Sequence, residues 1–145
     1  MKKVVLVLIL GFMPFLFVKS QCLHCDVDKV KMVNENLQHL TIQQIRDFLC
    51  TFDSSCKSNA EYSEWSNEVL FKVLEKAPSL FFQVIAEGNV DVKILIGEIE
   101  NPIPDVNTER ISNAVSKASA PTNLKEVFLK ALANAKRKSQ KSSKE

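Results

Sequence analysis

The chain has 145 residues, of which 46% are hydrophobic and 25% charged, and its formal net charge is +2. This length is typical of one small domain, and the hydrophobic fraction excludes a chain that is disordered throughout. The nearly balanced charge argues against a nucleic-acid-binding protein. Glycine occurs three times, at positions 11, 88 and 97, which argues against glycine-rich phosphate loops and tight-turned β architectures.

The first twenty residues have the pattern of a secretory signal peptide. Two lysines precede an apolar run over residues 4–18, which is shorter than the ~20 residues of a membrane-spanning helix. Small residues at Val18 and Ser20 suit a cleavage after residue 20. We therefore expect residues 1–20 to be removed and the protein to be secreted or located in the periplasm or cell envelope. An uncleaved N-terminal anchor is the alternative.

Removal of residues 1–20 changes the charge distribution. This segment holds three of the 19 basic residues and no acidic one, so the mature chain has a net charge of −1. The last ten residues hold five basic residues and one acidic residue, which leaves residues 21–135 with a net charge of −5. We expect one helical domain over 21–135 and a basic, disordered tail over 136–145.

All four cysteines lie in the first part of the mature chain, at Cys22, Cys25, Cys50 and Cys56. An even number of cysteines in an exported protein favours two disulfides, and three pairings are possible. A bond between Cys22 and Cys25 spans too little chain to stabilise the fold. We therefore favour bonds between the first pair and the second, either Cys25–Cys50 with Cys22–Cys56 or the other crossing.

Apolar residues recur at helical spacing along most of the mature chain. Helices are expected from Asp26, from a capping box at Thr41 and Gln44, and from a second capping box at Ser58 and Glu61. The third helix should end near Lys76, since Pro78 disfavours helical geometry in the residue before it and suits the first turn of the next helix. Gly88 is a plausible C-cap for that next helix.

The second half of the chain continues the helical pattern. Residues 90–99 fit a strand or a helix, and we favour a helix because no second convincing strand exists to pair with it. Further helices are expected from Asn107 or Thr108 and from a capping signal at Asn123 and Glu126. The sequence therefore predicts an all-α fold of six or seven helices, either an irregular bundle or a short helical-repeat stack. Its N-terminal helical hairpin should be tied by two disulfides.

Two short cysteine motifs resemble known families. The segment Cys22-Leu-His-Cys25 resembles the active site of periplasmic thiol oxidases of the thioredoxin class, which implies a reactive thiolate beside a histidine. The spacings of Cys22 with Cys25 and of Cys50 with Cys56 resemble those of saposin-like domains. That resemblance implies the bonds Cys22–Cys56 and Cys25–Cys50.

Other chemistry finds little support in the residue pattern. Four cysteines with His24 or His39 could hold zinc, but their spacing is unusual and an oxidising compartment disfavours free thiolates. No serine-nucleophile motif is present, and the acidic stripe of Glu61, Glu64 and Glu68 is typical of a solvated face. We expect no catalytic residue, metal site or cofactor.

Two surface features are candidates for contact with a partner. Tyr62 and Trp65 could form an aromatic contact patch, although the spacing favours Trp65 as a core residue beside Val69. The tail could contact an anionic surface, although a solubilising end is the simpler interpretation. Its basic residues are Lys136, Arg137, Lys138, Lys141 and Lys144.

The sequence as a whole predicts an exported, non-enzymatic helical protein that binds a protein or a small apolar ligand. The first alternative is a thiol–disulfide oxidoreductase that uses Cys22 and Cys25. The second is a protein that binds a membrane or lipid surface through its tail. Nucleic-acid binding is not expected of the folded body.

Overall fold

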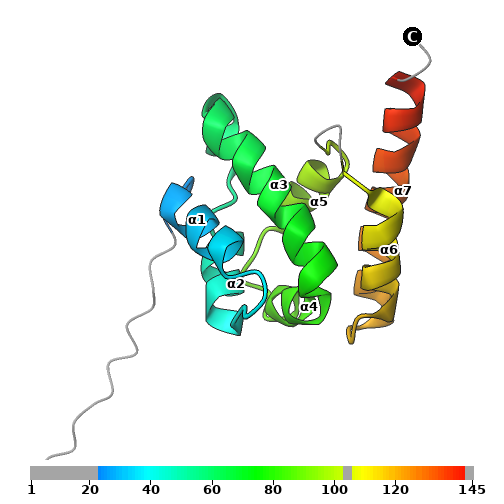
Figure 1. Ribbon diagram of the computed structural model, residues 1–145, viewed down its shortest axis with the longest axis horizontal. Coiled ribbons are helices and arrows are strands. Elements are labelled where there is room, and N and C mark those ends of the chain that lie inside the picture. The colour runs from blue at the N-terminus through cyan, green and yellow to red at the C-terminus, as the bar shows by residue number, and fades with distance from the viewer. Residues whose placement is uncertain (1–22, 103–105, 143–145) are drawn as a thin grey trace, which may run out of the picture.

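The computed structural model describes residues 23–102 and 106–142, and these residues form seven α-helices and one short 3-10 helix, with no strand among them (Figure 1). Residues 90–99, which also fitted a strand, contain a helix. The predicted signal peptide over residues 1–20 lies outside the described residues. The elements are α1 Val27–Glu35, α2 Ile42–Leu49, η1 Ser54–Ser58, α3 Ala60–Lys76, α4 Pro78–Ala86, α5 Val92–Ile99, α6 Thr108–Lys117 and α7 Thr122–Ser142.

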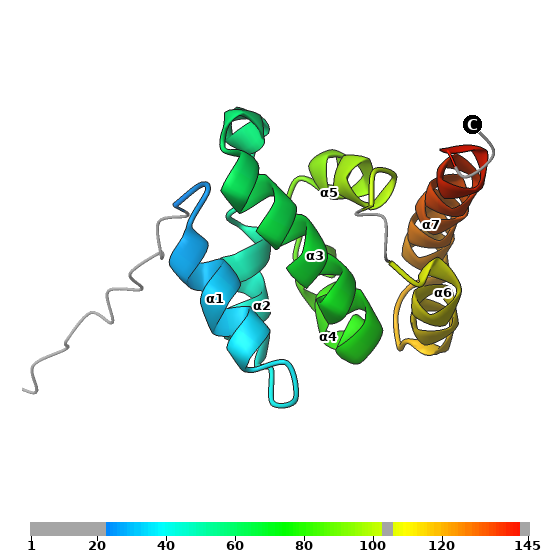
Figure 2. The ribbon, with the colours of Figure 1, turned by 45° about the horizontal axis from the view of Figure 1, so that its top comes forward.

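The helices pack both with their neighbours in the chain and with helices farther along it. Helix α1 packs against α2, α3 against α4, and α6 against α7. Across these pairs, α3 lies between α1 and α6, and α2 contacts α4. The short helix α5 packs against both α3 and α7, so it bridges the middle of the molecule to the C-terminal helix (Figures 1 and 2).

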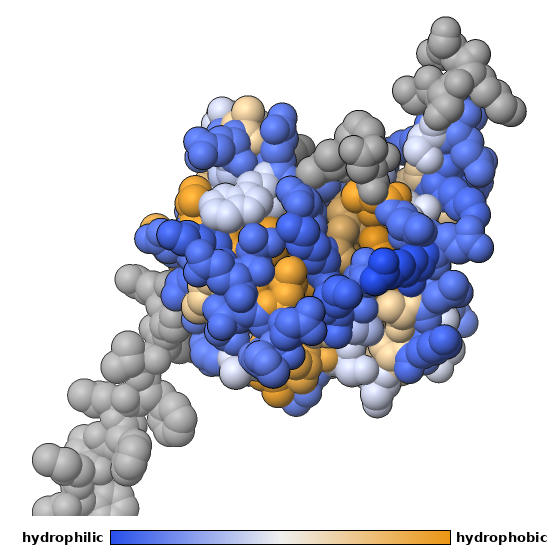
Figure 3. Space-filling view, viewed as in Figure 1, coloured by the Kyte–Doolittle hydropathy of each residue, from blue (hydrophilic) through white to orange (hydrophobic). Residues whose placement is uncertain are grey.

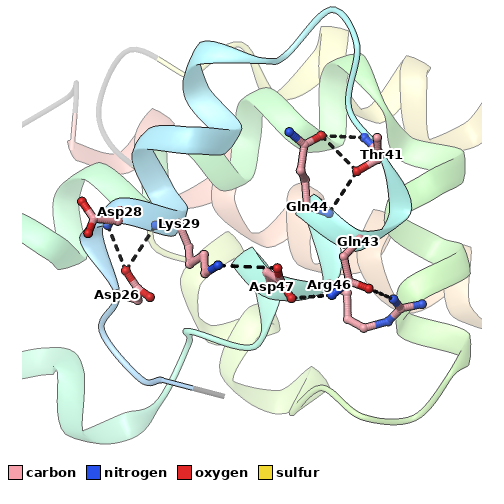
Figure 4. A network of polar contacts seen from close by, with 8 residues as sticks. All are labelled: Asp26, Asp28, Lys29, Thr41, Gln43, Gln44, Arg46 and Asp47. Atoms are coloured by element: carbon pink, nitrogen blue, oxygen red, sulfur yellow. Dashed lines mark hydrogen bonds and ion pairs between the residues drawn. The ribbon is translucent and has the colours of Figure 1, made fainter. Parts of the chain in front are cut away.

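Side-chain caps fix where several helices begin (Figure 4). The predicted capping box at Thr41 and Gln44 is confirmed, and Asp26 accepts two backbone N–H bonds at the start of α1. The predicted box at Ser58 is wrong because Ser58 belongs to η1. Asn59 caps α3 instead, and its Oδ1 accepts the N–H of Tyr62 at 3.1 Å.

The ends of α4 and the start of α7 show how proline and glycine set the remaining boundaries. Pro78 occupies the first turn of α4, as predicted. Gly88 follows the C-cap residue Glu87 and has a φ of +75°, which favours glycine. Asn123 does not cap α7, because the helix already begins at Thr122 and the N–H of Lys125 bonds to the Pro121 carbonyl.

One contiguous hydrophobic cluster runs from Val30 in α1 to Leu132 in α7. The rings of Phe81, Phe82 and Phe128 meet edge to face, with centroids 5.2–5.4 Å apart. Edge-to-face packing places the positive ring edge against the negative ring face, which stabilises the contact beyond the area buried. These rings join α4 to α7, so the C-terminal helix is part of the core.

The disulfide in the described chain joins Cys25, just before α1, to Cys56 in η1. It closes a loop with a sequence separation of 31, and the chain-entropy model gives such a loop up to about 4 kcal/mol of stabilisation. The prediction of a bond between the first pair and the second is confirmed for these residues. The pairing Cys25–Cys50 with Cys22–Cys56, which the saposin resemblance implied, is wrong. Cys22 lies outside the described residues, and none of the described cysteines is free.

The basic C-terminal segment differs from the expectation over residues 136–142. Helix α7 continues through Ser142 instead of ending before Lys136. Lysine, arginine and glutamine are good helix formers, so this segment can extend a helix whose preceding turns are fixed by the core. Lys136 also reaches Glu109 of α6 at 3.6 Å, and Lys138 donates to Asn101 Oδ1 at 3.1 Å.

Candidate functional site

The cysteine–histidine motif is built into the N-terminal structure. Cys25 has a φ of +58°, its N–H bonds to the Thr51 carbonyl, and its sulfur is bonded to Cys56. Cys56 is 5% exposed. Because Cys25 is bonded to a buried cysteine from another element, it does not form a disulfide with the other cysteine of the Cys22-Leu-His-Cys25 motif.

His24 lies beside a carboxylate at the edge of this region. Its Nδ1 is 3.4 Å from Oδ2 of Asp53. Hydrogen bonds from the hydroxyl and the backbone N–H of Ser55 lower the pKa of Asp53, and the charge of His24 adds a smaller effect in the same direction. Because its side chain accepts the backbone N–H of Ser55, Asp53 is the N-cap of η1.

The two aromatic residues proposed as partner contacts take different places. Tyr62 is 1% exposed, and its hydroxyl hydrogen-bonds to the Thr51 hydroxyl, so it lies in the core and offers no surface to a partner. Burial raises the pKa of Tyr62. Trp65 is half-buried and packs against the core cluster. The pair therefore does not form one exposed aromatic patch.

Four of the five basic residues predicted to contact an anionic surface lie on the last turns of α7, whose C-terminal end extends past the other helices in Figure 1. The surface there is predominantly hydrophilic (Figure 3). Lys136, Arg137, Lys138 and Lys141 are exposed, and Lys144 lies outside the described residues. Lys136 pairs with Glu109, so its charge is partly neutralised.

A shallow groove of about 420 Å³ lies between the end of α5 and α7. We call it the α5–α7 groove, and it is lined by Glu100, Asn134, Arg137, Lys138, Gln140 and Lys141. Three of these side chains are cationic and one is a carboxylate. The structure therefore brings three of the predicted basic residues to one concavity.

Hydrogen bonds position the groove side chains. Asn134 donates to Glu100 at 2.7 Å and accepts from Arg137 at 3.1 Å. Lys138 donates to Asn101, which follows α5. These hydrogen bonds connect α7 to the residues that follow α5. These contacts favour a recognition surface over freely moving charges.

The wall that α5 contributes is itself held by α3. Asn67, 5% exposed, donates from Nδ2 to both the backbone and the side-chain oxygen of Glu98 at 2.9 Å. Its Oδ1 has no hydrogen-bond partner within the described ranges. Sequence reasoning missed Asn67, Glu100 and Asn134, because a polar residue at helical spacing carries no signal of the distant element it contacts.

A second concave region lies at the start of α4, where apolar surface gathers at the lower edge of Figure 3. One hollow of about 280 Å³ lies between the α1–α2 loop and α4, and another of about 440 Å³ lies between α4 and the α6–α7 loop. Ser79 and Leu80 line both. Lys76 and His39 are the ionisable side chains at this region, and it lacks the charge density of the α5–α7 groove.

The described residues contain no group of three or more His, Cys, Asp or Glu side chains placed to hold a metal ion. Within the same residues, no helix has both the length and the apolar character needed to cross a membrane. Comparisons with family models, with curated proteins and with solved structures found no match to this chain.

Proposed function

We propose that this chain is an exported, non-enzymatic helical protein that acts by binding a partner through its surface. The Cys25–Cys56 disulfide carries the proposal. It places the cysteine of the most chemically suggestive motif in a structural bond, and such bonds persist in oxidising compartments. This supports a secreted, periplasmic or cell-envelope location.

We further infer that Cys22 and Cys50 form the second disulfide. Cys50 carries no free thiol, and Cys25 and Cys56 are bonded to each other, which leaves Cys22 as its partner among the four cysteines of the chain. Two bonds would then fix the segment before α1 to the end of α2 and to η1. This arrangement is the other of the two crossings that the sequence left open.

The packing of α1 with α2, α3 with α4 and α6 with α7 supports a short stack of helical hairpins. Stacked hairpins expose extended surfaces at their edges and loops, which repeat proteins use for binding. Here the two concave regions occur at such places, one at the α4 loops and one between α5 and α7. The architecture therefore supports recognition by surface complementarity.

Photo-crosslinking in cells that produce this protein tests the proposal. A photoreactive amino acid would replace Gln140 in the α5–α7 groove, Gln83 in the α4 region, or exposed Lys31 of α1 as a control. We expect one dominant adduct from one of the two concave positions, Gln140 or Gln83, and none from Lys31. We also expect a 1:1 complex when the purified partner is added to the purified protein. Equal labelling from all three positions, or no complex between purified components, would overturn it.

Two assays separate the alternatives. An oxidoreductase would catalyse insulin reduction by dithiothreitol, whereas a structural protein leaves the uncatalysed rate unchanged. A lipid-surface protein would co-sediment with phosphatidylserine vesicles and would lose this binding when residues 136–145 are removed. The exposed basic end of α7 is the observation that favours the lipid alternative, and failure of both chain forms to sediment would exclude it.

A further inference from the structure

The α5–α7 groove carries a local positive charge, whereas residues 21–135 have a net charge of −5. Arg137, Lys138 and Lys141 line it with a single carboxylate, Glu100, and one oxygen of that carboxylate accepts from Asn134. Lys138 donates to the neutral amide of Asn101, and Arg137 donates to Asn134 and to the Ala133 carbonyl. No ion pair among the described residues neutralises these three cations.

Arg137 is held in place and keeps donors free. A guanidinium has five N–H groups in a planar fork that suits a carboxylate. Two hydrogen bonds fix it against its own helix, through Nε to Ala133 and through Nη2 to Asn134. The remaining N–H groups, on Nη1 and Nη2, can donate two hydrogen bonds to an incoming carboxylate. Such a contact is stronger and more directional than a contact to a lysine.

Lys141 lies one helical turn beyond Arg137, so the two side chains share a face of α7. Side chains four residues apart on a helix have Cβ atoms about 5–6 Å apart. A partner segment with two carboxylates at a similar spacing would meet both cations at once. Such a spacing occurs between acidic residues three or four positions apart on a helix.

We propose that the α5–α7 groove binds an acidic segment of a protein partner, with Arg137 as the main carboxylate contact and Lys138 and Lys141 beside it. This inference rests on the proposed function and names the class of partner. A shallow groove lined by three cations suits acidic side chains of a partner segment that lies along it. Lipid-binding clusters usually have four to eight basic residues. Here three of the four basic residues on the described end of α7 line the groove, and the fourth, Lys136, is engaged by Glu109.

Fluorescence anisotropy with the full mature chain tests the assignment. The probe is a fluorescein-labelled helical peptide with glutamates four residues apart, and its control has glutamine at those positions. We expect the glutamate peptide to bind and the glutamine peptide not to bind. Affinity should fall as salt rises, because exposed charge pairs are screened.

Matched variants locate the binding. The double substitution Arg137→Glu and Lys141→Glu should weaken binding about tenfold or more, as expected for the loss of one charge-assisted hydrogen bond. Lys31→Glu with Lys117→Glu changes the net charge equally at exposed positions outside the groove, and should leave the affinity within about twofold of wild type. Equal weakening by both pairs would overturn the groove assignment.

A charge-neutral substitution tests the positioning of Arg137. Asn134→Ala removes the side chain that holds Arg137 without changing the charge. It should weaken binding severalfold, and circular dichroism melting should show that the variant is folded. Unchanged affinity in a folded variant would contradict the positioning of Arg137 by Asn134.

Other occupants give different outcomes. Binding to phosphatidylserine vesicles without binding to the peptide would replace the protein partner by a lipid surface. Salt-sensitive self-association of the protein alone, abolished by the Arg137→Glu and Lys141→Glu pair, would make a second copy the occupant. If no peptide binds but a purified crosslinked partner still binds the groove variants, this inference fails while the proposed function stands.

Discussion

The hydroxyl groups of Thr51 and Tyr62 hydrogen-bond to each other at 2.5 Å in the core, joining the end of α2 to the first turn of α3. Thr51 also donates to the Phe48 carbonyl at 2.8 Å. A threonine hydroxyl has one proton, so Tyr62 is the donor to Thr51. This contact lies beside the Cys25–Cys56 disulfide, because Cys25 donates its N–H to the Thr51 carbonyl.

Substitutions at this pair should be coupled. Tyr62→Phe removes a buried hydrogen bond and should lower the free energy of unfolding by about 1 kcal/mol. Thr51→Val leaves the buried Tyr62 hydroxyl without this acceptor and should cost about 1–3 kcal/mol. The double variant should lose less than the sum of the two, as measured by urea denaturation. Strictly additive losses would show that the two hydroxyls do not interact.

Tyr62 should also make stability depend on alkaline pH. Burial raises its pKa above the ordinary value of 10.0, so the folded state favours the neutral phenol. The resulting stability is fully present below the pKa of the unfolded state and is lost as pH rises through the folded pKa. Tyr62 is the only tyrosine in the chain, so its absorbance titration at high pH reports this pKa directly.

Tyr62→Phe is the control, because it lacks the phenol. The part of the stability loss at alkaline pH that this phenol causes should be absent from the variant. Melting temperatures of the two proteins from neutral pH to above the ordinary tyrosine pKa of 10.0 provide the comparison, because the lysines titrate alike in both. A tyrosine titration at its ordinary pKa in the folded protein would contradict burial of Tyr62.

The two glycines of the described chain should respond to alanine in opposite directions. Gly88 has a φ of +75°, so Gly88→Ala should cost about 1 kcal/mol, although no atom lies within 4 Å of the added methyl. Gly97 lies in α5 with the same free space, and Gly97→Ala should stabilise by about 0.5–1 kcal/mol. Thermal unfolding of both variants measures the two signs, and a stabilising Gly88→Ala would contradict the helix end.

Arg46 and Glu87 should contribute stability that is lost in acid. Two guanidinium nitrogens of Arg46 contact the two carboxylate oxygens of Glu87 at 2.7 Å, linking α2 to the end of α4. The hydrogen bonds from Arg46 lower the pKa of Glu87, so this stability is present above the unfolded pKa and is lost as pH falls through the folded pKa.

Glu87→Gln should therefore lower the melting temperature near neutral pH, and the difference from wild type should shrink as the pH falls below the ordinary glutamate value of 4.5. Glu64→Gln, at an exposed residue of α3 past its first turn, controls for the removal of a surface carboxylate. A difference for Glu87→Gln that stays constant across this pH range would show that the Arg46 contact does not form in solution.

Local patterns predicted most of the helices. The capping box at Thr41 and Gln44 and the proline at position 78 act within a few residues, so their effects are visible in a single sequence. The choice of a helix over residues 90–99 followed from the lack of a second strand, and Asp91 caps that helix through its side chain. The prediction that Ser58 caps α3 was wrong because Ser58 is the last residue of the 3-10 helix η1, so the cap position moves to Asn59.

The sequence alone could not predict features that depend on contacts between residues far apart in the chain. The spacing of the cysteines allowed two crossed pairings, and the packing of η1 beside the start of α1 selects Cys25–Cys56. Tyr62 carries a polar group, yet Thr51 satisfies it inside the core. The α5–α7 groove joins Glu100 to residues more than thirty positions away, and no local pattern indicates that proximity.

A disulfide map tests most directly whether the cysteines hold the fold and perform no redox chemistry. Non-reducing proteolysis and mass spectrometry of the folded protein, with thiol titration of the same sample, give that map. We predict linked peptides containing Cys25 with Cys56 and Cys22 with Cys50, and no titratable thiol. A linked Cys22–Cys25 pair that mild reductant opens while the protein stays folded would contradict the structural role and favour the oxidoreductase.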